Sequence, residues 1–307
     1  MTEAANGGEL DPRGSPDGAT SEGAAPESAL RKKRPRRSLL QTLRRLLVLY
    51  LLICLGLFAL QRKIQYPGDA SHASLPDNAL RRHVREVEFK TSDGLTLTAW
   101  FHAHKTSGTT IILFPGNGGN REWRYGFAQM VRGQGRASVL QVDYRGYGGN
   151  PGKPTEERIY LDAEAALAWV RENTDGPIVL MGESLGTGVA IEMASRHPID
   201  GLIIHAGYTS TVDVGASHFW FLPVGLLLRD RFQSGAKIGG IQCPLLFLHG
   251  KSDRVIPIRI GEKLFSLANE PKKWIAIEGA GHDDLWLIDV GRYFSAVRDF
   301  ITDVSEP

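Results

Sequence analysis

From about residue 84 onward, short apolar runs alternate with amphipathic stretches, and this alternation restricts the fold more than any other feature of the chain. The first two runs flank Ser92-Asp93-Gly94 and predict a hairpin. The later runs alternate with stretches of helical periodicity, with one exception after Leu202–Ile204, and this is typical of a mostly parallel sheet with helices on both faces. The predicted strands are Val87–Lys90, Leu95–His102, Thr110–Phe114, Ala137–Val142, Pro177–Met181, Leu202–Ile204, Pro244–Leu248 and Trp274–Ile277, and the longer predicted helices are Thr155–Glu172, capped by Thr155 or a neighbour, and Leu185–Ser195.

The stretch 206–240 breaks this alternation. It is irregular and contains the aromatic run Phe219-Trp220-Phe221. In a parallel α/β sheet a segment of this kind lies over the carboxyl ends of the strands, so we expect a small lid there. Its acidic residues Asp213 and Asp230 are expected to be solvated, which is the usual state of surface carboxylates.

The charge of the chain is distributed in blocks that its net value of +2 conceals. Residues 1–30 carry six acids and one base, whereas residues 31–63 carry ten bases and no acid. The remainder carries 25 bases and 28 acids, and this faintly acidic balance argues against a nucleic-acid-binding domain. Because the first stretch is rich in Gly, Ala, Ser, Pro and Glu without apolar periodicity, we expect residues 1–38 to be disordered.

The run Leu46–Leu60 holds fifteen residues without a charge, between basic flanks. Spanning a bilayer takes about 17–25 residues, and the leucines that precede this run extend its apolar face. We therefore expect a transmembrane anchor at 39–63, a linker at 64–83 and a folded domain at 84–303. Eight bases lie between Arg31 and Arg45, whereas only Arg62 and Lys63 directly follow the run, so the N-terminus is expected in the cytoplasm and the domain on the exoplasmic side, in a periplasm or a lumen.

A cleaved signal peptide is the alternative to an anchor, since its apolar region is typically about 7–15 residues long. Cleavage requires small residues at alternate positions, and Leu-Phe-Ala-Leu at 57–60 matches this pattern poorly. Lipid attachment at Cys54 is disfavoured by the bulky Ile53 before it. With Cys243, the chain has two cysteines, too few for a disulfide framework or a zinc site.

A G-x-S-x-G motif, Gly182-Glu183-Ser184-Leu185-Gly186, lies between a predicted strand and a predicted helix. A serine on a sharp strand-to-helix turn has strained backbone angles, and only small neighbours let the turn close. The turn exposes Ser184 Oγ as a nucleophile and places the helix N-terminus behind it. The backbone N–H of Leu185 then faces a developing oxyanion.

A serine nucleophile needs a general base and an acid that orients it. The expected chain order is Ser, then Asp or Glu, then His, each just past a strand. Asp253 and His282 occupy such positions, and the predicted triad is Ser184, Asp253 and His282. We expect His249 to support Asp253.

The loop after the strand Thr110–Phe114 supplies the second oxyanion donor in this arrangement. Three glycines let its backbone amides approach the site, and the N–H of Asn117 is the candidate, with that of Gly118 second. A phosphate-binding loop is the alternative, but the Lys-Ser/Thr of such loops is missing here.

The chain from about 84 to 303 resembles the α/β-hydrolases, and more narrowly the single-pass, membrane-anchored serine hydrolases of that superfamily. The resemblance depends on five motifs in the family's order: Pro115-Gly116-Asn117-Gly118-Gly119-Asn120, Asp143-Tyr144-Arg145-Gly146-Tyr147-Gly148, Gly182-Glu183-Ser184-Leu185-Gly186, Asp253-Arg254-Val255-Ile256-Pro257 and Gly281-His282. Two departures are Pro115, where histidine is more usual, and His205-Ala206-Gly207-Tyr208, where a small or acidic residue and a proline are usual. In the second motif, Asp143 and Arg145 are expected to be structural.

The resemblance implies hydrolysis of esters, thioesters or amides, and the anchor favours lipid or other acyl substrates. We expect a serine hydrolase for carboxylic esters or thioesters that works through an acyl-enzyme, without cofactor or metal. A serine peptidase or amidase of the same fold, and a catalytically idle scaffold or binding protein, are the alternatives. Dehalogenases and epoxide hydrolases are excluded, because they carry an aspartate where this chain has Ser184. The residues do not identify the substrate, its chain length or the oligomeric state.

Overall fold

A computed structural model describes residues 36–75 and 83–306 of the chain. The chain divides after Leu49, and the unit that begins at Tyr50 contains the whole sheet. The disorder predicted for 1–38 falls, up to residue 35, outside the described residues, and residues 36–38 already belong to a helix. The domain boundaries drawn from the sequence otherwise stay predictions.

The first helix, α1, runs from Arg36 to Gln65 and contains the apolar run. Its stretch Ser38–Gln65 is long and apolar enough to cross a membrane, and only 6% of its most apolar window is buried. This low burial separates α1 from a core helix, whereas a signal sequence would have the same length and composition. Insertion and orientation in a membrane therefore remain predictions.

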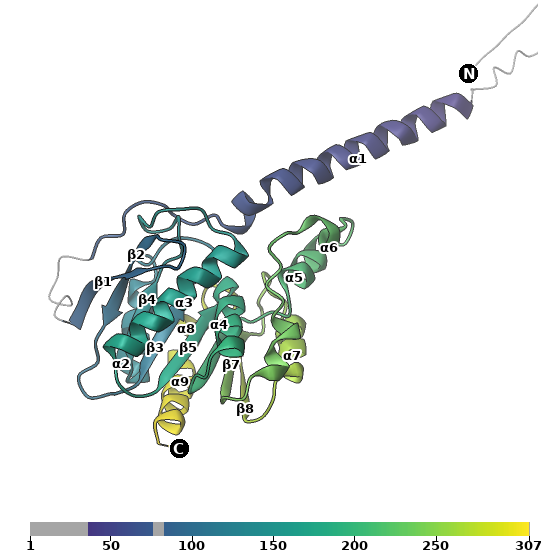
Figure 1. The fold of residues 1–307 in the computed structure, drawn as a ribbon. Coiled ribbons are helices and arrows are strands. Elements are labelled where there is room, and N and C mark those ends of the chain that lie inside the picture. Colours follow the sequence, from purple (N-terminus) through teal and green to yellow (C-terminus); the bar gives the residue numbers. More distant parts are fainter. Residues whose placement is uncertain (1–35, 76–82, 307) are drawn as a thin grey trace, which may run out of the picture. The chain divides into compact units, whose positions relative to one another are not determined.

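In the part of the chain that the structure describes, eight strands form one sheet in the order β1-β2-β4-β3-β5-β6-β7-β8 (Figure 1). The predicted hairpin is the antiparallel pair β1 and β2, β2 pairs antiparallel with β4, and all remaining neighbours are parallel. The sequence-predicted α/β fold with a mostly parallel sheet is thus confirmed. The strands are β1 (Val84–Lys90), β2 (Thr96–His102), β3 (Thr110–Phe114), β4 (Ser138–Val142), β5 (Ile178–Glu183), β6 (Gly201–His205), β7 (Leu245–Gly250) and β8 (Lys272–Ile277).

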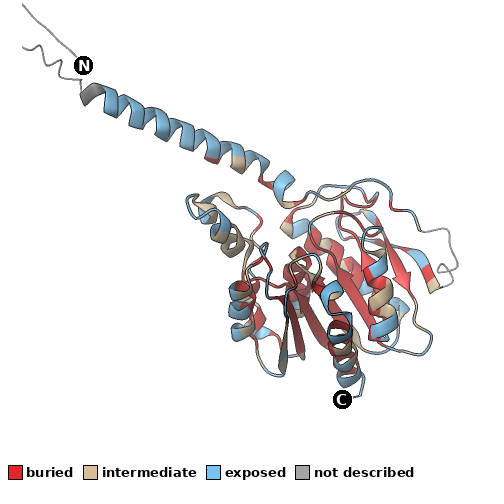
Figure 2. Ribbon diagram, turned by 180° about the vertical axis from the view of Figure 1, so that it is seen from behind, coloured by how far each residue is buried: buried red, intermediate tan, exposed pale blue. Residues whose placement is uncertain are grey.

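Helices cover both faces of the sheet, and each face has its own apolar core (Figure 2). Neighbouring residues of β3 divide between the two cores, with Ile111 and Leu113 on one face and Ile112 and Phe114 on the other. This division is the period-two alternation of a strand buried on both sides. One face is covered by α3 (Glu156–Asn173), α4 (Leu185–Arg196) and α7 (Ile258–Leu267), and the other by α2 (Tyr125–Gly135) and α9 (Val290–Ser305).

The region 206–240, expected as a lid, contains short helical pieces instead of a regular element. These are α5 (Thr211–His218), α6 (Val224–Leu227) and the 3-10 turns η2 (Ser234–Ala236) and η3 (Ile238–Gly240). The segment expected as a linker makes specific contacts of its own. Tyr66 and Ala73 are buried, and Gly68 forms a β-bridge with Gly119.

The parallel strands place the candidate residues at one edge of the sheet. Ser184 directly follows β5, and Asn117 follows β3. Asp253 and His282 lie just beyond the ends of β7 and β8; a short helix, α8 (Leu285–Ile288), comes after the latter. Because carboxyl ends of parallel strands share an edge, four segments distant in sequence converge there.

Candidate active site

Ser184 occupies a strained strand-to-helix turn. Its backbone has φ 49° and ψ −117°, outside the regions that L-residues normally adopt. A Cβ at Gly182 would collide with the backbone of Gly186 and Thr187, and one at Gly186 would collide with the carbonyl of Phe114. The glycines of G-x-S-x-G are therefore required by packing, and the turn predicted from the sequence is formed.

Ser184, His282 and Asp253 form one hydrogen-bonded chain. His282 Nε2 lies 2.9 Å from Ser184 Oγ, and His282 Nδ1 lies 2.8 Å from Asp253 Oδ2. The other oxygen of Asp253 accepts the backbone N–H groups of Val255 and Ile256, each at 2.8 Å. The three residues predicted as a triad are thus within the distances that proton transfer from serine to histidine requires.

The charge environment prepares His282 to act as a base. Burial alone would lower the pKa of His282, but the hydrogen bond to Asp253 and the charge of that carboxylate outweigh it, so the pKa lies above its usual value. Burial likewise opposes ionisation of Asp253, yet the contact with His282 holds the pKa of Asp253 below its usual value. The pair therefore favours a carboxylate beside an imidazole that accepts a proton readily.

The two predicted oxyanion donors remain available. Among the described residues, no acceptor is found for the backbone N–H of Asn117 or of Leu185. Leu185 begins α4, where the first amides of a helix have no intrahelical partner. The other groups of Asn117 are engaged, since its carbonyl accepts the Tyr147 hydroxyl at 2.9 Å and its side chain donates to the carbonyl of Gln65 at 3.2 Å.

Arg124 is a contributor to the site that sequence reasoning missed. Its Nη1 donates to the carbonyl of Gly118 at 2.6 Å, and its Nε donates to Glu183 at 3.0 Å. Glu183 directly precedes Ser184, so the Arg124 side chain links the predicted oxyanion loop to the serine turn. A carboxylate next to Ser184 was a signal that a buried cation should lie nearby, because such a charge needs a partner.

Two cavities meet at Ser184 and Asn117 and differ in lining. One, of about 490 Å³, is apolar and extends between the end of α1 and the lid region. The other, of about 640 Å³, contains the ionisable side chains of Arg124, Glu183 and His282. A substrate can thus place an apolar part and a polar part on opposite sides of the serine.

Comparison with known proteins identifies the family. A model of the alpha/beta hydrolase family matches residues 111–237. The protein Rv2307c of Mycobacterium tuberculosis is 38% identical over 226 residues, which cover 72% of this chain and 80% of that protein. The chain belongs to the α/β-hydrolase family. YfhR of Escherichia coli K12 is also similar, at 30% identity over 256 residues, 79% of this hydrolase and 87% of YfhR.

Solved structures agree with this fold. The esterase Pf2001 of Pyrococcus furiosus aligns with a TM-score of 0.63 at 21% identity, covering 76% of the hydrolase and 97% of the esterase. At that identity the likeness concerns the fold alone.

The two departures from the family pattern have structural partners in this hydrolase. Pro115 uses its carbonyl to accept the Tyr144 hydroxyl at 2.9 Å. His205 is buried against the Tyr293 hydroxyl at 2.9 Å, and burial lowers its pKa to about 4. Tyr208 donates to the carbonyl of Leu185 at 3.1 Å. The last two contacts stabilise the segment behind Ser184, and His205 borders the polar cavity.

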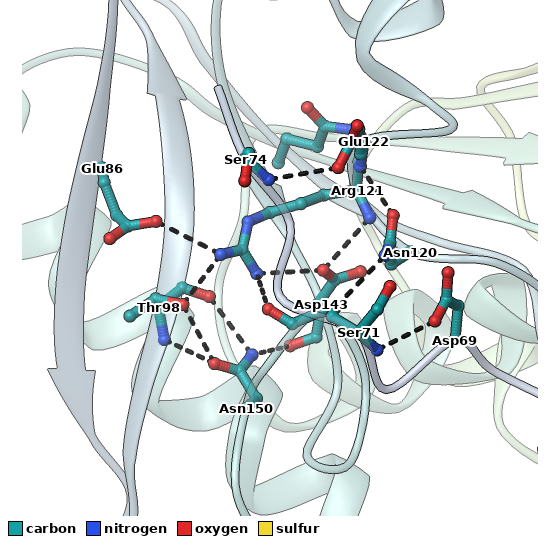
Figure 3. Close-up of polar contacts among 12 residues, drawn as sticks. Asp69, Ser71, Ser74, Glu86, Thr98, Asn120, Arg121, Glu122, Asp143 and Asn150 are labelled. Carbon is teal, nitrogen blue, oxygen red and sulfur yellow. Dashed lines mark hydrogen bonds and ion pairs between the residues drawn. The ribbon is translucent and has the colours of Figure 1, made fainter. Parts of the chain in front are cut away.

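A buried arginine fixes the far end of the oxyanion loop (Figure 3). Arg121 donates its backbone N–H and Nη1 to Asp143, at 3.1 and 3.0 Å, and its Nη2 to Thr98 at 3.0 Å. Neither member of the Arg121–Asp143 pair is exposed. Arg145 pairs in the same way with Asp162. Asp143 and Arg145 are therefore structural in this hydrolase, as the sequence predicted.

Of the remaining expectations, the one for His249 is met and the one for Asp230 is wrong. His249 Nε2 lies 3.6 Å from Asp253 Oδ2 and donates to the Ile256 carbonyl at 2.9 Å, so it supports the acid as expected. Asp230 was expected to be solvated, and this is wrong: it is 5% exposed, because Arg62 and Tyr66 bind its carboxylate. Within residues 36–75 and 83–306, no group of three or more His, Cys, Asp or Glu side chains is arranged to hold a metal ion.

Proposed function

We propose that this protein is a membrane-anchored serine hydrolase that cleaves carboxylic esters or thioesters of acyl substrates through an acyl-enzyme. The observation that carries the proposal is the hydrogen-bonded Ser184–His282–Asp253 chain at a strained turn, beside an apolar cavity. A structural role alone does not account for a serine held at φ 49° with its hydroxyl on an imidazole.

Acylation begins when His282 Nε2 takes the Ser184 proton and Oγ attacks the substrate carbonyl. The amides of Asn117 and Leu185 stabilise the resulting oxyanion. His282 then gives its proton to the leaving group, while Asp253 holds the ring in the required tautomer and stabilises the imidazolium. Water repeats the same steps on the acyl-enzyme and releases the acid.

Ester or thioester cleavage is supported by the lining of the two cavities. The apolar one offers an acyl chain a surface with few competing polar groups, and the polar one can receive an alcohol or thiol leaving group.

Membrane attachment through α1 is supported by its length, apolar composition and low burial. The basic block before the apolar run favours a cytoplasmic N-terminus and an exoplasmic hydrolase domain, in a periplasm or a lumen. A reporter fused after Pro307 that is active only outside the cytoplasm tests this orientation. A reporter that is active in the cytoplasm, together with complete protection of the hydrolase domain from protease added outside the cell membrane, would reverse the orientation. Secretion of a product without residues 1–60 would show that the segment is a cleaved signal peptide.

The nucleophile is tested with the full chain in detergent, a fluorophosphonate probe and p-nitrophenyl butyrate. We expect Ser184→Ala to abolish labelling, and Ser184→Ala and His282→Ala each to lower turnover by about 10⁴–10⁶-fold, with little further loss in the double variant, because the triad acts as a unit. Melting temperatures near that of the wild type show that the fold is retained. Labelling of wild type without ester turnover would favour an amidase, and no labelling an idle scaffold.

A further inference from the structure

The end of α1 forms part of a cavity that reaches the nucleophile. Leu57, Gln61 and Ile64 of this helix line the apolar cavity, and Ser184 and Leu185 line it too. The opposite side consists mainly of apolar residues of the lid region, with Thr211 and His218 among them. A helix whose sequence predicts only an anchor thus contributes a wall to the candidate substrate site.

An ion pair between the half-exposed Arg62 side chain and the buried Asp230 carboxylate holds this end of α1 against the lid region. Arg62 donates Nε and Nη2 to the two carboxylate oxygens of Asp230, at 3.0 and 3.1 Å. Tyr66 donates to the same carboxylate at 3.1 Å, and Asp230 is 5% exposed. Bidentate arginine–carboxylate pairs fix the direction of the two side chains as well as their distance, so the last turns of α1 have a defined orientation here.

Two glutamines complete the attachment and extend it to the oxyanion loop. Gln61 donates to the carbonyl of Leu227 at 3.0 Å and accepts the backbone N–H of Arg229 at 2.7 Å. The side-chain amide of Gln65 donates to the backbone carbonyl of Asp230 at 2.9 Å, and the backbone carbonyl of Gln65 accepts a hydrogen bond from Asn117 Nδ2 at 3.2 Å. The wall therefore contacts the loop that carries a proposed oxyanion donor.

The tip of the lid region exposes large apolar side chains near the apolar run of α1. Trp220 and Leu226 are 83% and 84% exposed, and Phe219 and Phe221 are about half exposed. The Tyr50 hydroxyl donates to the Phe221 carbonyl at 3.0 Å, and Tyr50 belongs to the apolar run. Exposed tryptophan and phenylalanine beside a membrane helix are typical of the bilayer interface.

We propose that the last turns of α1 and the lid region together form a binding subsite for a long acyl chain, which enters from the hydrocarbon layer between α1 and the lid tip. This inference rests on the proposed function. Leu57 belongs to the apolar run and also lines the cavity, so the cavity extends to the depth of the hydrocarbon. The substrate class is the membrane-resident ester or thioester of a long fatty acid, with its leaving group in the polar cavity.

The subsite is tested by filling it in the full chain, reconstituted in phosphatidylcholine vesicles. Leu57→Trp places an indole in the cavity, and the matched control Leu60→Trp changes the same residue type on the same helix, at a position that does not line the cavity. We expect Leu57→Trp to lower the ratio of p-nitrophenyl palmitate to p-nitrophenyl butyrate hydrolysis by about tenfold or more, because the long chain loses its apolar surface. Leu60→Trp should keep the wild-type ratio.

Each result bears on a different part of the argument. Equal ratios in Leu57→Trp, Leu60→Trp and wild type would overturn the subsite while leaving the esterase proposal intact. Absence of hydrolysis of both esters by wild type would overturn the proposed function and the inference with it. Should Leu57→Trp not fold, as judged by its melting temperature, Ile64→Trp serves the same comparison.

A second probe locates the bound acyl chain directly. A hexadecyl fluorophosphonate with a diazirine near the chain end labels Ser184, and irradiation should then crosslink it to residues 57–65 or to the lid region. Crosslinks confined to the polar cavity, at Trp123 or Trp286, would overturn the proposal. Wild type should also cleave monopalmitoyl glycerol in vesicles faster than dissolved palmitoyl-CoA. The reverse preference would overturn the bilayer as the source of the chain.

Discussion

Asp143 and Asp253 are both closed off from solvent, and both follow strands whose carboxyl ends lie at one edge of the sheet. Asp143 pairs with Arg121, which is itself completely buried. Asp253 pairs with His282, which is 13% exposed and borders the polar cavity. Burial and a charged or polar partner are thus common to a structural pair and a candidate catalytic pair. Access of the partner to a cavity is what separates them.

The pKa values differ in the same sense. Burial raises the pKa of Asp143 to about 6 despite the attraction of Arg121. One of its oxygens has no hydrogen-bond partner among the described residues. Burial also opposes the ionisation of Asp253, but the contact with His282 and the backbone N–H of Ile256 hold the pKa of Asp253 below its usual value. Both carboxylate oxygens of Asp253 thus accept hydrogen bonds, whereas among the described residues one oxygen of Asp143 accepts none. Hydrogen bonds to the charged form favour ionisation, which suits an acid that must stay charged beside an imidazole.

The largest expected effect is on the catalytic side of this comparison. Asp253→Asn should lower turnover by about 10⁴-fold with little change in melting temperature, because the amide leaves His282 in the wrong tautomer. Ester hydrolysis and thermal unfolding of the full chain measure both quantities, and Asp213→Asn in the lid region is the control. Loss of turnover in the control with normal activity in Asp253→Asn would show that the lid supplies the acid.

Asp143→Ala should have the opposite profile. It leaves the Arg121 guanidinium buried with only Glu86, which is partly exposed, as a charged partner. We expect the free energy of unfolding to fall by about 3 kcal/mol, while turnover per labelled enzyme stays within a few-fold of wild type. Denaturant titration in detergent and active-site counting with fluorophosphonate separate the two. A stable variant that has lost turnover would place Asp143 in the catalytic machinery.

Arg124→Ala tests a pair that has features of both. Without the guanidinium, the Gly118 carbonyl and the Glu183 carboxylate lose their common partner. Because the oxyanion loop is then held less firmly, kcat should fall by about tenfold with little change in KM, less than the loss of a whole oxyanion donor. Steady-state kinetics on p-nitrophenyl butyrate measure this. A rise in KM alone would instead assign Arg124 to substrate binding.

The smallest expected effect is on the pH profile. His282 must be neutral to accept the serine proton, and its pKa lies above the usual value, so kcat/KM should fall as the pH decreases through a midpoint above about 6.5. In Asp253→Asn the midpoint should move to lower pH, because burial still lowers the pKa of His282 and the carboxylate that raised this pKa is gone. Because this variant turns over slowly, the rate of fluorophosphonate labelling as a function of pH measures its midpoint. Asp143→Ala should keep the wild-type midpoint, and a shared shift would contradict the separation of the two acids.

Much of the candidate site was predictable because its signals are local. Each of Ser184, Asp253 and His282 stands just past its own apolar run, and the glycines around the serine are required by a turn of a few residues. Once the strands are parallel, their carboxyl ends coincide without further information. The sequence alone therefore determined the fold class, the order of the strands along the chain and the three residues that meet as the candidate triad.

The contacts that only the tertiary structure decided join residues far apart in the chain. Arg62 and Asp230 are separated by 168 positions, and Arg124 and Glu183 by 59. No periodicity links such partners, and a lone carboxylate such as Asp230 is by default a solvated one. Its burial follows only when the end of α1 and the lid region are packed together. Whether α1 is an anchor alone or also a wall of the site depends on that packing, since the apolar side chains that suit a bilayer suit an acyl chain equally well.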